Sequence, residues 1–346
     1  MTEKVLVLAG KTLDKVMPAI RLGRLRAEPT DLRRLDPGSC ACRVEDVLSI
    51  NLGPLAYFCD ASESDPLHVA VSAPGLRRDL RGFEFSLFPE EFPAGTLMAI
   101  SPNILVPSFP AYFMLKARDL DFEELLLLGM ELCGTYAHDS YTRADGRCEF
   151  LVEPALEADD LRGYLEEATG IKGVNPAKTA ASWILDNSYS PQETILALEQ
   201  YLKPMRGGRG YPKPRLNPEI EVPREFRRLT ARDTFKPDIY WEGMLDLEYD
   251  SAYHSDPAQV ERDKARASDV QALGIPVIQA TGLSLSTCER AELLGRQIGK
   301  ALETGMGRPM TMRLRRLYAP ELQERRDRLH LKLRRLSGLD GGRRAR

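Results

Sequence analysis

Hydrophobic and polar residues alternate in three stretches of the front half, HVAVSA, GFEFSLF and TLMAISPNILV. This pattern is typical of strands with one buried face. Two helices are expected after them, at residues 111–118 and 122–132, and Asp121 is a suitable N-cap for the second. Another helix is expected near residues 12–25. We therefore predict a smaller α+β domain over residues 1–150, whose role the pattern does not indicate.

Residues 151–187 carry helical periodicity, and we expect them to connect this domain to a second one. The second domain is predicted to open with a helix that runs to about Leu202. Ser190 can cap this helix, Pro191 suits its first position, and Glu193 completes a capping box.

Three strands, a helix and a fourth strand are expected next, at residues 219–222, 235–241, 244–249, 256–273 and 275–280. The link Glu242-Gly243 predicts a hairpin between the second and third strands, and Gly274 ends the helix. The order is α-β-β-β-α-β. A long helix over 287–305, opened by a capping box from Ser286 to Glu289, completes a domain predicted for residues 188–306.

The composition is that of an ordinary globular protein. At 346 residues and 43% hydrophobic content, the chain is long enough for two or three domains with separate cores. No apolar run approaches the ~20 residues that span a bilayer, and the N-terminus does not resemble a signal peptide. We expect a cytoplasmic protein without membrane contact. The six scattered cysteines are expected to be reduced and mostly buried.

Charge is distributed unevenly. From Arg308 to Arg346 there are 13 Lys/Arg against 4 Asp/Glu, so the rest of the chain sums to −12 when the whole carries −3. A body that acidic is not typical of a protein that binds phosphates over a wide face. The basic tail, residues 307–346, is either a contact for nucleic-acid phosphates or a solvated helix at 320–336 with its basic residues facing outward. The sequence leaves both open.

Three carboxylates gather in the predicted hairpin. Asp238 lies in one arm, and Glu248 and Asp250 share one face of the other because strand side chains alternate. Leu245 and Tyr249 belong to the opposite, apolar face, so we expect the acidic face to line a solvated cleft. Carboxylates so close together repel one another unless a cation is present, and oxygen ligands suit Mg²⁺ or Mn²⁺.

At this point the chain resembles the PD-(D/E)xK restriction-endonuclease-like superfamily, through the αβββαβ order and the pattern P-D-x₉-E-x-D. More narrowly, EYDSAYHSDPAQVERDKARASDVQALGIPVI resembles bacterial domains related to the very-short-patch-repair endonuclease. SPQETILALEQYL and GGRGYPKPRLN extend the match to residues 188–281. Residues 68–136 more loosely resemble proteins with an abortive-infection antitoxin-like front half.

The resemblance implies a mixed sheet and a metal-dependent DNA endonuclease. By its pattern, Asp238 is the principal ligand of Mg²⁺ or Mn²⁺, and Glu248 and Asp250 complete the metal site. His254 serves the attacking water or the phosphate. Glu193 lies at the edge of the site.

The chain departs from the pattern at two positions. Ser251 stands where the related domains have glycine, and Asp250 stands where the superfamily has the lysine that contacts the scissile phosphate. Lys264 on the next helix is a candidate replacement. The alternative is structural: Asp263, in the apolar stripe of that helix, pairs with Arg266.

Other assignments also have structural alternatives. Glu193 is explained by its capping box, and His254 by capping of the helix that starts at Asp256. For the whole protein, the main alternative is a catalytically idle nuclease fold that acts as a DNA-binding regulator or an antitoxin-like protein. A third reading is an interaction protein whose front half binds another protein.

Overall fold

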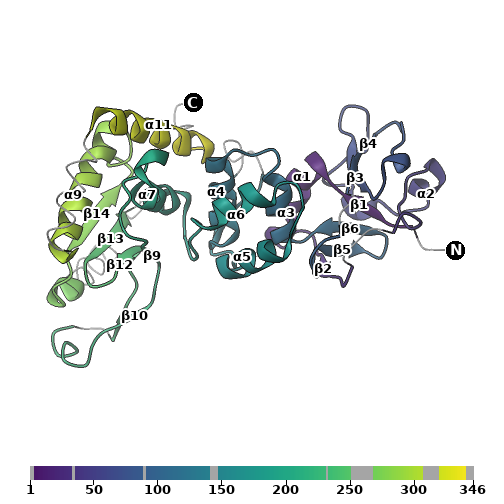
Figure 1. The fold of residues 1–346 in the computed structure, drawn as a ribbon. Coiled ribbons are helices and arrows are strands. Elements are labelled where there is room, and N and C mark those ends of the chain that lie inside the picture. Colours follow the sequence, from purple (N-terminus) through teal and green to yellow (C-terminus); the bar gives the residue numbers. More distant parts are fainter. Residues whose placement is uncertain are drawn as a thin grey trace, which may run out of the picture. The chain divides into compact units, whose positions relative to one another are not determined.

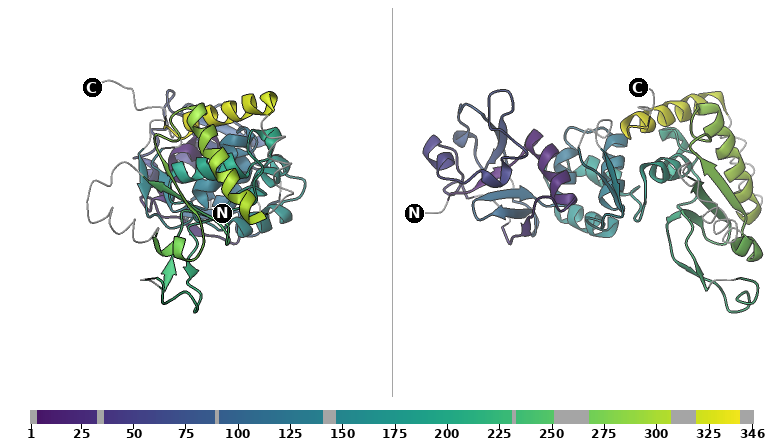
Figure 2. Two further views of the ribbon diagram at one scale, coloured as in Figure 1. Left: turned by 90° about the vertical axis from the view of Figure 1, so that its left-hand side faces the viewer. Right: turned by 180° about the vertical axis from the view of Figure 1, so that it is seen from behind.

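The computed structural model describes residues 4–32, 36–88, 91–140, 147–230, 233–250, 268–306 and 319–339. The chain forms two compact units (Figures 1 and 2). Unit 1 contains Met1–Cys133 and Ala137–Ile184, and unit 2 contains Gly134–Tyr136 and Leu185–Arg346. Both units mix helices with sheets, as the sequence predicts. In the described part of the chain, every helix is too short or too polar to span a membrane.

Unit 1 is built on a six-stranded sheet in the order β2-β5-β6-β1-β3-β4. The strands are β1 (Leu6–Leu8), β2 (Glu28–Pro29), β3 (Leu67–Val71), β4 (Phe83–Leu87), β5 (Leu97–Ser101) and β6 (Ile104–Pro107). The first two alternating stretches form β3 and β4, which pair in parallel. The third stretch is two strands, because the chain turns back between Ser101 and Ile104 and pairs β5 with β6.

The helices of unit 1 include the pair that the sequence predicts after the strands. They are α1 (Gly10–Arg21), α2 (Val44–Leu48), α3 (Phe109–Lys116), α4 (Phe122–Leu132), α5 (Ala158–Glu167) and α6 (Val174–Ala181). Two 3-10 turns, η1 (Gly53–Leu55) and η2 (Pro74–Leu76), accompany them. Strands β7 (Tyr136–His138) and β8 (Cys148–Phe150) form a separate two-stranded sheet. Asp121 accepts hydrogen bonds from the backbone N–H groups of Glu123 and Glu124, which confirms its N-cap role. Helices α5 and α6 pack against α3 and α4 (Figure 1), so residues 151–184 belong to unit 1 and do not form a separate connector.

Unit 2 contains a four-stranded mixed sheet in the order β14-β13-β12-β9. The strands are β9 (Arg215–Leu216), β12 (Ile239–Trp241), β13 (Leu245–Asp250) and β14 (Val277–Thr281). Strands β9, β12 and β13 are antiparallel neighbours, whereas β13 and β14 run parallel. The pairing of Ile239 with Leu247 and of Trp241 with Leu245 confirms the predicted hairpin.

Two strand predictions are corrected. The stretch 235–241 is interrupted, because Pro237 lacks the N–H that a ladder position needs. Its first residues form β11 (Thr234–Phe235), which pairs with β10 (Ile220–Glu221) in a separate two-stranded sheet. The first strand of the main sheet is therefore β9, and not the strand expected at 219–222.

The helices of unit 2 are α7 (Pro191–Tyr201), α9 (Cys288–Met306) and α11 (Pro320–Leu336), with a 3-10 turn, η3 (Pro204–Arg206). The predicted helix before β14 is described only at its end, residues 268–272. Helix α9 is capped by Thr287, whose Oγ1 accepts from the Arg290 N–H at 3.3 Å. The capping box expected from Ser286 is therefore wrong by one residue, since the Ser286 hydroxyl instead donates to the Leu283 carbonyl.

A buried ionic cluster joins α11 to α9 and to the Gly-rich loop. The Glu292 carboxylate accepts from Arg209 at 3.0 Å, Arg296 at 3.1 Å and Arg326 at 2.9 Å. Glu292, Arg209 and Arg326 are all buried. The Arg209 side chain also lies directly over Gly295, where a Cβ atom would meet its Nε at 1.8 Å. The GGRGY motif is thus explained by packing against α9.

Helix α11 is consequently part of the core of unit 2. Arg326, which donates to Glu292, and His330 are both buried, and His330 Nδ1 lies 2.6 Å from Glu199 Oε1. Figure 2 shows α11 beside α9, and the two helices are in contact. The expectation of a solvated helix with its basic residues facing outward is therefore corrected: two of its basic residues have buried carboxylate partners. All six cysteines are free, and Cys40, Cys42 and Cys133 are buried.

We predict that Glu292→Ala lowers the stability of unit 2 by about 3–5 kcal/mol, because two buried arginines lose their carboxylate. The only two tryptophans are Trp183 in unit 1 and Trp241, which is buried in unit 2. Urea unfolding followed by fluorescence in a Trp183→Phe background therefore reports unit 2. Glu289→Ala, at an exposed position of the same helix, is the control. Equal midpoints for the two variants would contradict the role of the cluster.

Candidate functional site

Three segments of unit 2 meet around the Glu193 carboxylate. Glu193 lies in the first turn of α7, Asn217 directly follows β9, and Asp238 directly precedes β12. The Asn217 backbone N–H donates to the Asp238 carbonyl at 2.9 Å, and its Nδ2 donates to Glu193 Oε2 at 2.8 Å. One asparagine therefore connects the helix to both strands.

Glu193 is more deeply buried, and its carboxylate accepts more hydrogen bonds, than helix capping requires. Its backbone N–H donates to Ser190 Oγ at 3.1 Å, which confirms the predicted N-cap. Its carboxylate, however, accepts from Ser190 Oγ and the Tyr189 N–H, both at 3.0 Å, in addition to Asn217. Only 6% of the residue is exposed. A capping glutamate on a helix surface needs neither this burial nor the asparagine.

Glu193 also interacts electrostatically with Asp238. Burial, together with the nearby negative charge of Asp238, raises the pKa of Glu193 to about 7, and the hydrogen bonds from Asn217, Tyr189 and Ser190 offset part of this rise. Two interacting carboxyl groups titrate as a pair. Near neutral pH Glu193 can therefore hold or release a proton beside Asp238.

Asp238 is fixed to the neighbouring strand. Its Oδ2 accepts a hydrogen bond from the Tyr249 N–H of β13 at 2.7 Å. The antiparallel register that pairs Ile239 with Leu247 places Asp238 opposite Glu248, so these two carboxylates belong to the same face of the sheet. Asp250 ends β13 and is exposed.

The acidic face of β13 is not an open cleft, which corrects the expectation from the sequence. Asp246 is 1% exposed and Glu248 is 8% exposed. Asp246 pairs with Tyr240 across the hairpin, and Tyr240 packs in a buried cluster with Val270 of the following helix. The cluster therefore lies on the side of the sheet that carries Asp246, and of the three acids on β13 only Asp250 at the strand end is exposed.

Within the described ranges, no three His, Cys, Asp or Glu side chains are grouped so that they could hold a metal ion. The structure thus does not gather Asp238, Glu248 and Asp250 into the expected three-carboxylate cluster. It brings Asp238 together with Glu193 instead. His254 and Lys264 lie outside the described residues, as do Asp263 and Arg266.

Sequence reasoning missed two neighbours of this pair. Asn217 has a positive φ of 46°, which asparagine tolerates better than most residues, and it stands before a proline. Tyr189 contributes its N–H to Glu193 and its ring to Lys236, whose Nζ lies 4.7 Å from the ring centroid and donates to the tyrosine hydroxyl. The unusual Leu-Asn-Pro segment was the one signal available for Asn217.

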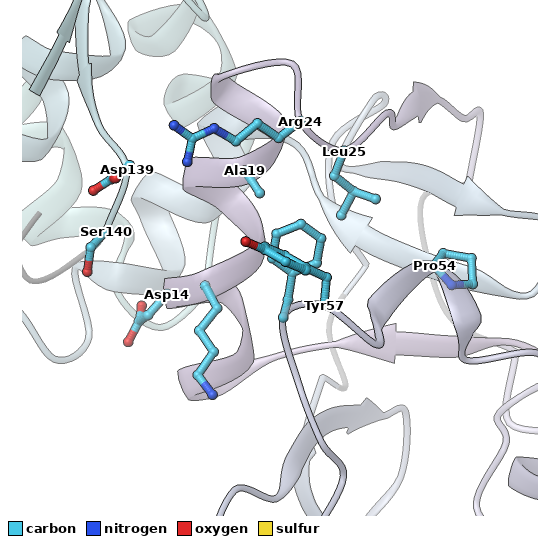
Figure 3. Close-up of a pocket in the computed structure, with 10 residues that line it drawn as sticks. Asp14, Ala19, Arg24, Leu25, Pro54, Tyr57, Asp139 and Ser140 are labelled. Carbon is cyan, nitrogen blue, oxygen red and sulfur yellow. The ribbon is translucent and has the colours of Figure 1, made fainter. Parts of the chain in front are cut away.

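Unit 1 contains a separate cavity of about 660 Å³ beside α1 (Figure 3). The exposed Tyr57 and several charged residues line it. Three of its charged side chains have ion-pair partners within the unit: Lys15 with Asp65 at 2.6 Å, Asp14 with Lys116 at 2.8 Å, and Arg24 with Glu149. Asp139, which also lines the cavity, accepts a hydrogen bond from the Arg147 N–H at 2.7 Å.

No protein-family model, curated protein or solved structure matches this chain significantly. Its function therefore has to be inferred from the geometry of the site.

We predict a pH dependence of stability that Glu193→Gln removes. A folded-state pKa of about 7 against 4.5 means that Glu193 favours folding below pH 4.5, and that this contribution is lost as pH rises through 7. The wild type should match Glu193→Gln at pH 5 and be less stable at pH 8, by on the order of 3 kcal/mol at most. Urea unfolding monitored by Trp241 measures this difference.

Glu221→Gln is the matched control, because Glu221 is exposed in the same unit. A constant difference between wild type and Glu193→Gln from pH 5 to pH 8 would show that Glu193 does not titrate in this range.

Proposed function

We propose that unit 2 is a PD-(D/E)xK-like domain that hydrolyses phosphodiester bonds in DNA with the help of Mg²⁺ or Mn²⁺. The observation that carries this proposal is the interacting pair of Glu193 and Asp238. Two carboxylates from separate elements are held together, one of them buried, although like charges repel. Such an arrangement is expected where a cation or a proton has a function.

The order of elements supports the same proposal. Apart from the separate β10–β11 sheet, which lies between β9 and β12 in the chain, the elements follow in the order α7, β9, β12, β13, residues 268–272 and β14. This order supports the αβββαβ arrangement with a mixed sheet that the resemblance implies. The carboxylate pair lies where the first helix meets the strand that follows the Pro-Asp dipeptide.

The donor set fits a hard divalent cation. Mg²⁺ commonly binds through one or two carboxylates and keeps several waters or substrate phosphates as its other ligands. Asp238 and Glu193 would hold it, with Glu248 on the same face as Asp238 and Asp250 at the strand end. When bound, the cation would polarise the phosphate and lower the pKa of an attacking water.

The residues of the chain prepare this site. Tyr249 fixes Asp238 through its N–H, and Asn217 and Tyr189 fix Glu193. With no cation bound, Glu193 has a pKa of about 7 and can hold a proton near neutral pH, whereas a bound cation would displace that proton and leave the carboxylate as its ligand. In the proposal, His254 and Lys264 keep the roles that the resemblance implies for the water and the phosphate.

DNA is the proposed partner. The exposed Arg328 and Arg335 of α11 are proposed to contact its phosphates. Because α11 also holds buried residues of unit 2, deleting the tail would disturb the unit and is not a clean test of this contact.

A catalytically idle nuclease fold that binds DNA as a regulator, or acts as an antitoxin-like protein, is the second candidate. The burial of Glu248 favours it, because a carboxylate covered by the sheet's own core is less accessible to a metal ion and substrate. The lysine missing from position 250 favours it as well.

We predict metal-dependent cleavage of plasmid and oligonucleotide DNA by the full chain in Mg²⁺ or Mn²⁺, and none in EDTA. Asp238→Asn should lower the rate roughly 100-fold, because it removes a charged ligand. The asparagine can still accept the Tyr249 hydrogen bond, so the fold is expected to persist. Asp233→Asn, at an exposed position of the same segment, is the control.

Cleavage that survives in Asp238→Asn would contradict the proposed site. Absence of cleavage by the wild type on duplex, mismatched and single-stranded substrates would favour the idle, DNA-binding alternative.

A further inference from the structure

We propose that the cavity of unit 1 binds a neutral nucleoside, whose base stacks on the ring of Tyr57. The inference concerns a different unit from the proposed nuclease site and does not depend on it. The cavity has a volume of about 660 Å³, and the residues that line it all belong to unit 1. Cavities of this size commonly bind small organic ligands.

Tyr57 presents an aromatic ring to solvent at this cavity. The residue is 92% exposed, whereas a tyrosine normally buries much of its ring. Its backbone is held by its neighbours, because the N–H groups of Phe58 and Cys59 donate to the carbonyl of the buried Leu55 at 2.8 and 3.0 Å. The Phe58 ring contacts the Tyr57 ring edge-on, with centroids 5.4 Å apart. The turn therefore holds a flat apolar surface at the cavity, on which a ligand ring can stack.

Apolar and polar side chains lie on different sides of this ring. In Figure 3, Leu25 and Pro54 lie on one side of Tyr57. Asp14 and Asp139 lie on the other side, toward which the tyrosine hydroxyl points. A ligand that suits this arrangement has a flat ring whose edge carries hydrogen-bonding groups.

The charges at the cavity favour an uncharged ligand. The two acids and the two bases that line it balance in formal charge. Both bases are ion-paired, Lys15 with Asp65 at 2.6 Å and Arg24 with Glu149. A phosphate at either base would lie next to the partner carboxylate, whose like charge opposes it. A charged group on the ligand would therefore add little affinity.

The two acids supply hydrogen-bond acceptors to such a ligand. Asp139 accepts from the Arg147 N–H at 2.7 Å, and Asp14 accepts from Lys116 at 2.8 Å. A carboxylate offers about four acceptor positions on its two oxygens, so each acid can also accept from a further donor. Base N–H groups and ribose hydroxyls are donors of this kind. A nucleoside combines them with a flat ring and no charge, and proteins read bases by this combination of stacking and edge hydrogen bonds.

The test is isothermal titration calorimetry of the full chain with adenosine as the probe. The wild type should bind with a Kd on the order of 100 μM, as expected for a ligand of this size. Tyr57→Ala should weaken binding roughly 10-fold or more, because the stacking surface is lost. Tyr57→Phe keeps the ring and should retain most of the affinity.

Two further variants locate the effect. Asp139→Asn can still accept from the Arg147 N–H but loses the charged acceptor, and it should weaken binding roughly 5-fold. Leu48→Ala is the matched control, because Leu48 is 79% exposed in the same unit and does not line the cavity. It should leave the affinity unchanged. Thermal unfolding must be the same for all variants, so that a loss of affinity reports the ligand contact and not the fold.

Two other ligands test the chemical class. Adenosine monophosphate should bind within about threefold of adenosine, because the paired bases give its phosphate little attraction. Benzyl alcohol has a flat ring without the polar edge of a base, and it should bind at least roughly 10-fold more weakly.

Each other result overturns the inference. Absence of binding at millimolar adenosine, or equal affinities of the wild type and Tyr57→Ala, would exclude a nucleoside stacked on this ring. Much tighter binding of adenosine monophosphate would show that the cavity selects the phosphate, and equal binding of benzyl alcohol would show that it selects only a ring. DNA cleavage by unit 2 enters none of these measurements, so the proposed function stands or fails separately.

Discussion

The hydrogen bond from the Asn217 amide to the Glu193 carboxylate is the constraint on which the candidate site depends. It joins the first helix of unit 2 to the strand β9, while the Asn217 backbone holds the start of β12. The bond also keeps a carboxyl group buried next to Asp238, where burial and like charge raise its pKa to about 7. The geometry of the fold and the electrostatics of the site are therefore set by the same few atoms.

Elements with local chemical signals were predictable from the sequence. Asp121 and Ser190 satisfy the first N–H groups of their helices, and Glu242-Gly243 closes a tight hairpin, as their residue types predict. Strand boundaries were less predictable where they depend on a backbone N–H that proline lacks, or on which strand pairs with which. Pro237 divides an apolar run into two strands of different sheets, and the two-residue strand β9 has no periodicity to reveal it.

The candidate site was predictable only in part, because alternation gives the face of a strand but not what covers that face. The pattern correctly places Glu248 and Asp250 on one side of β13. It does not show that the Tyr240 and Val270 cluster packs on this side, or that Glu248 is buried. Likewise, the positive charge of the tail is visible in the sequence, whereas the burial of Arg326 depends on Glu292, a distant partner that only the fold supplies.

Placement of charge connects these observations. Where unit 2 buries positive charge, it supplies carboxylates, as at Glu292 for Arg209 and Arg326. At the candidate site two like charges are neighbours instead, because Glu193 and Asp238 interact with each other. Unit 2 pairs its buried charges closely at Glu292, whereas it holds two like charges together at Glu193 and Asp238. The repulsion between these two carboxylates raises the free energy of the folded unit. Binding of a cation would lower that free energy, because it places positive charge between the two carboxylates, and we therefore propose this pair as the functional site of unit 2.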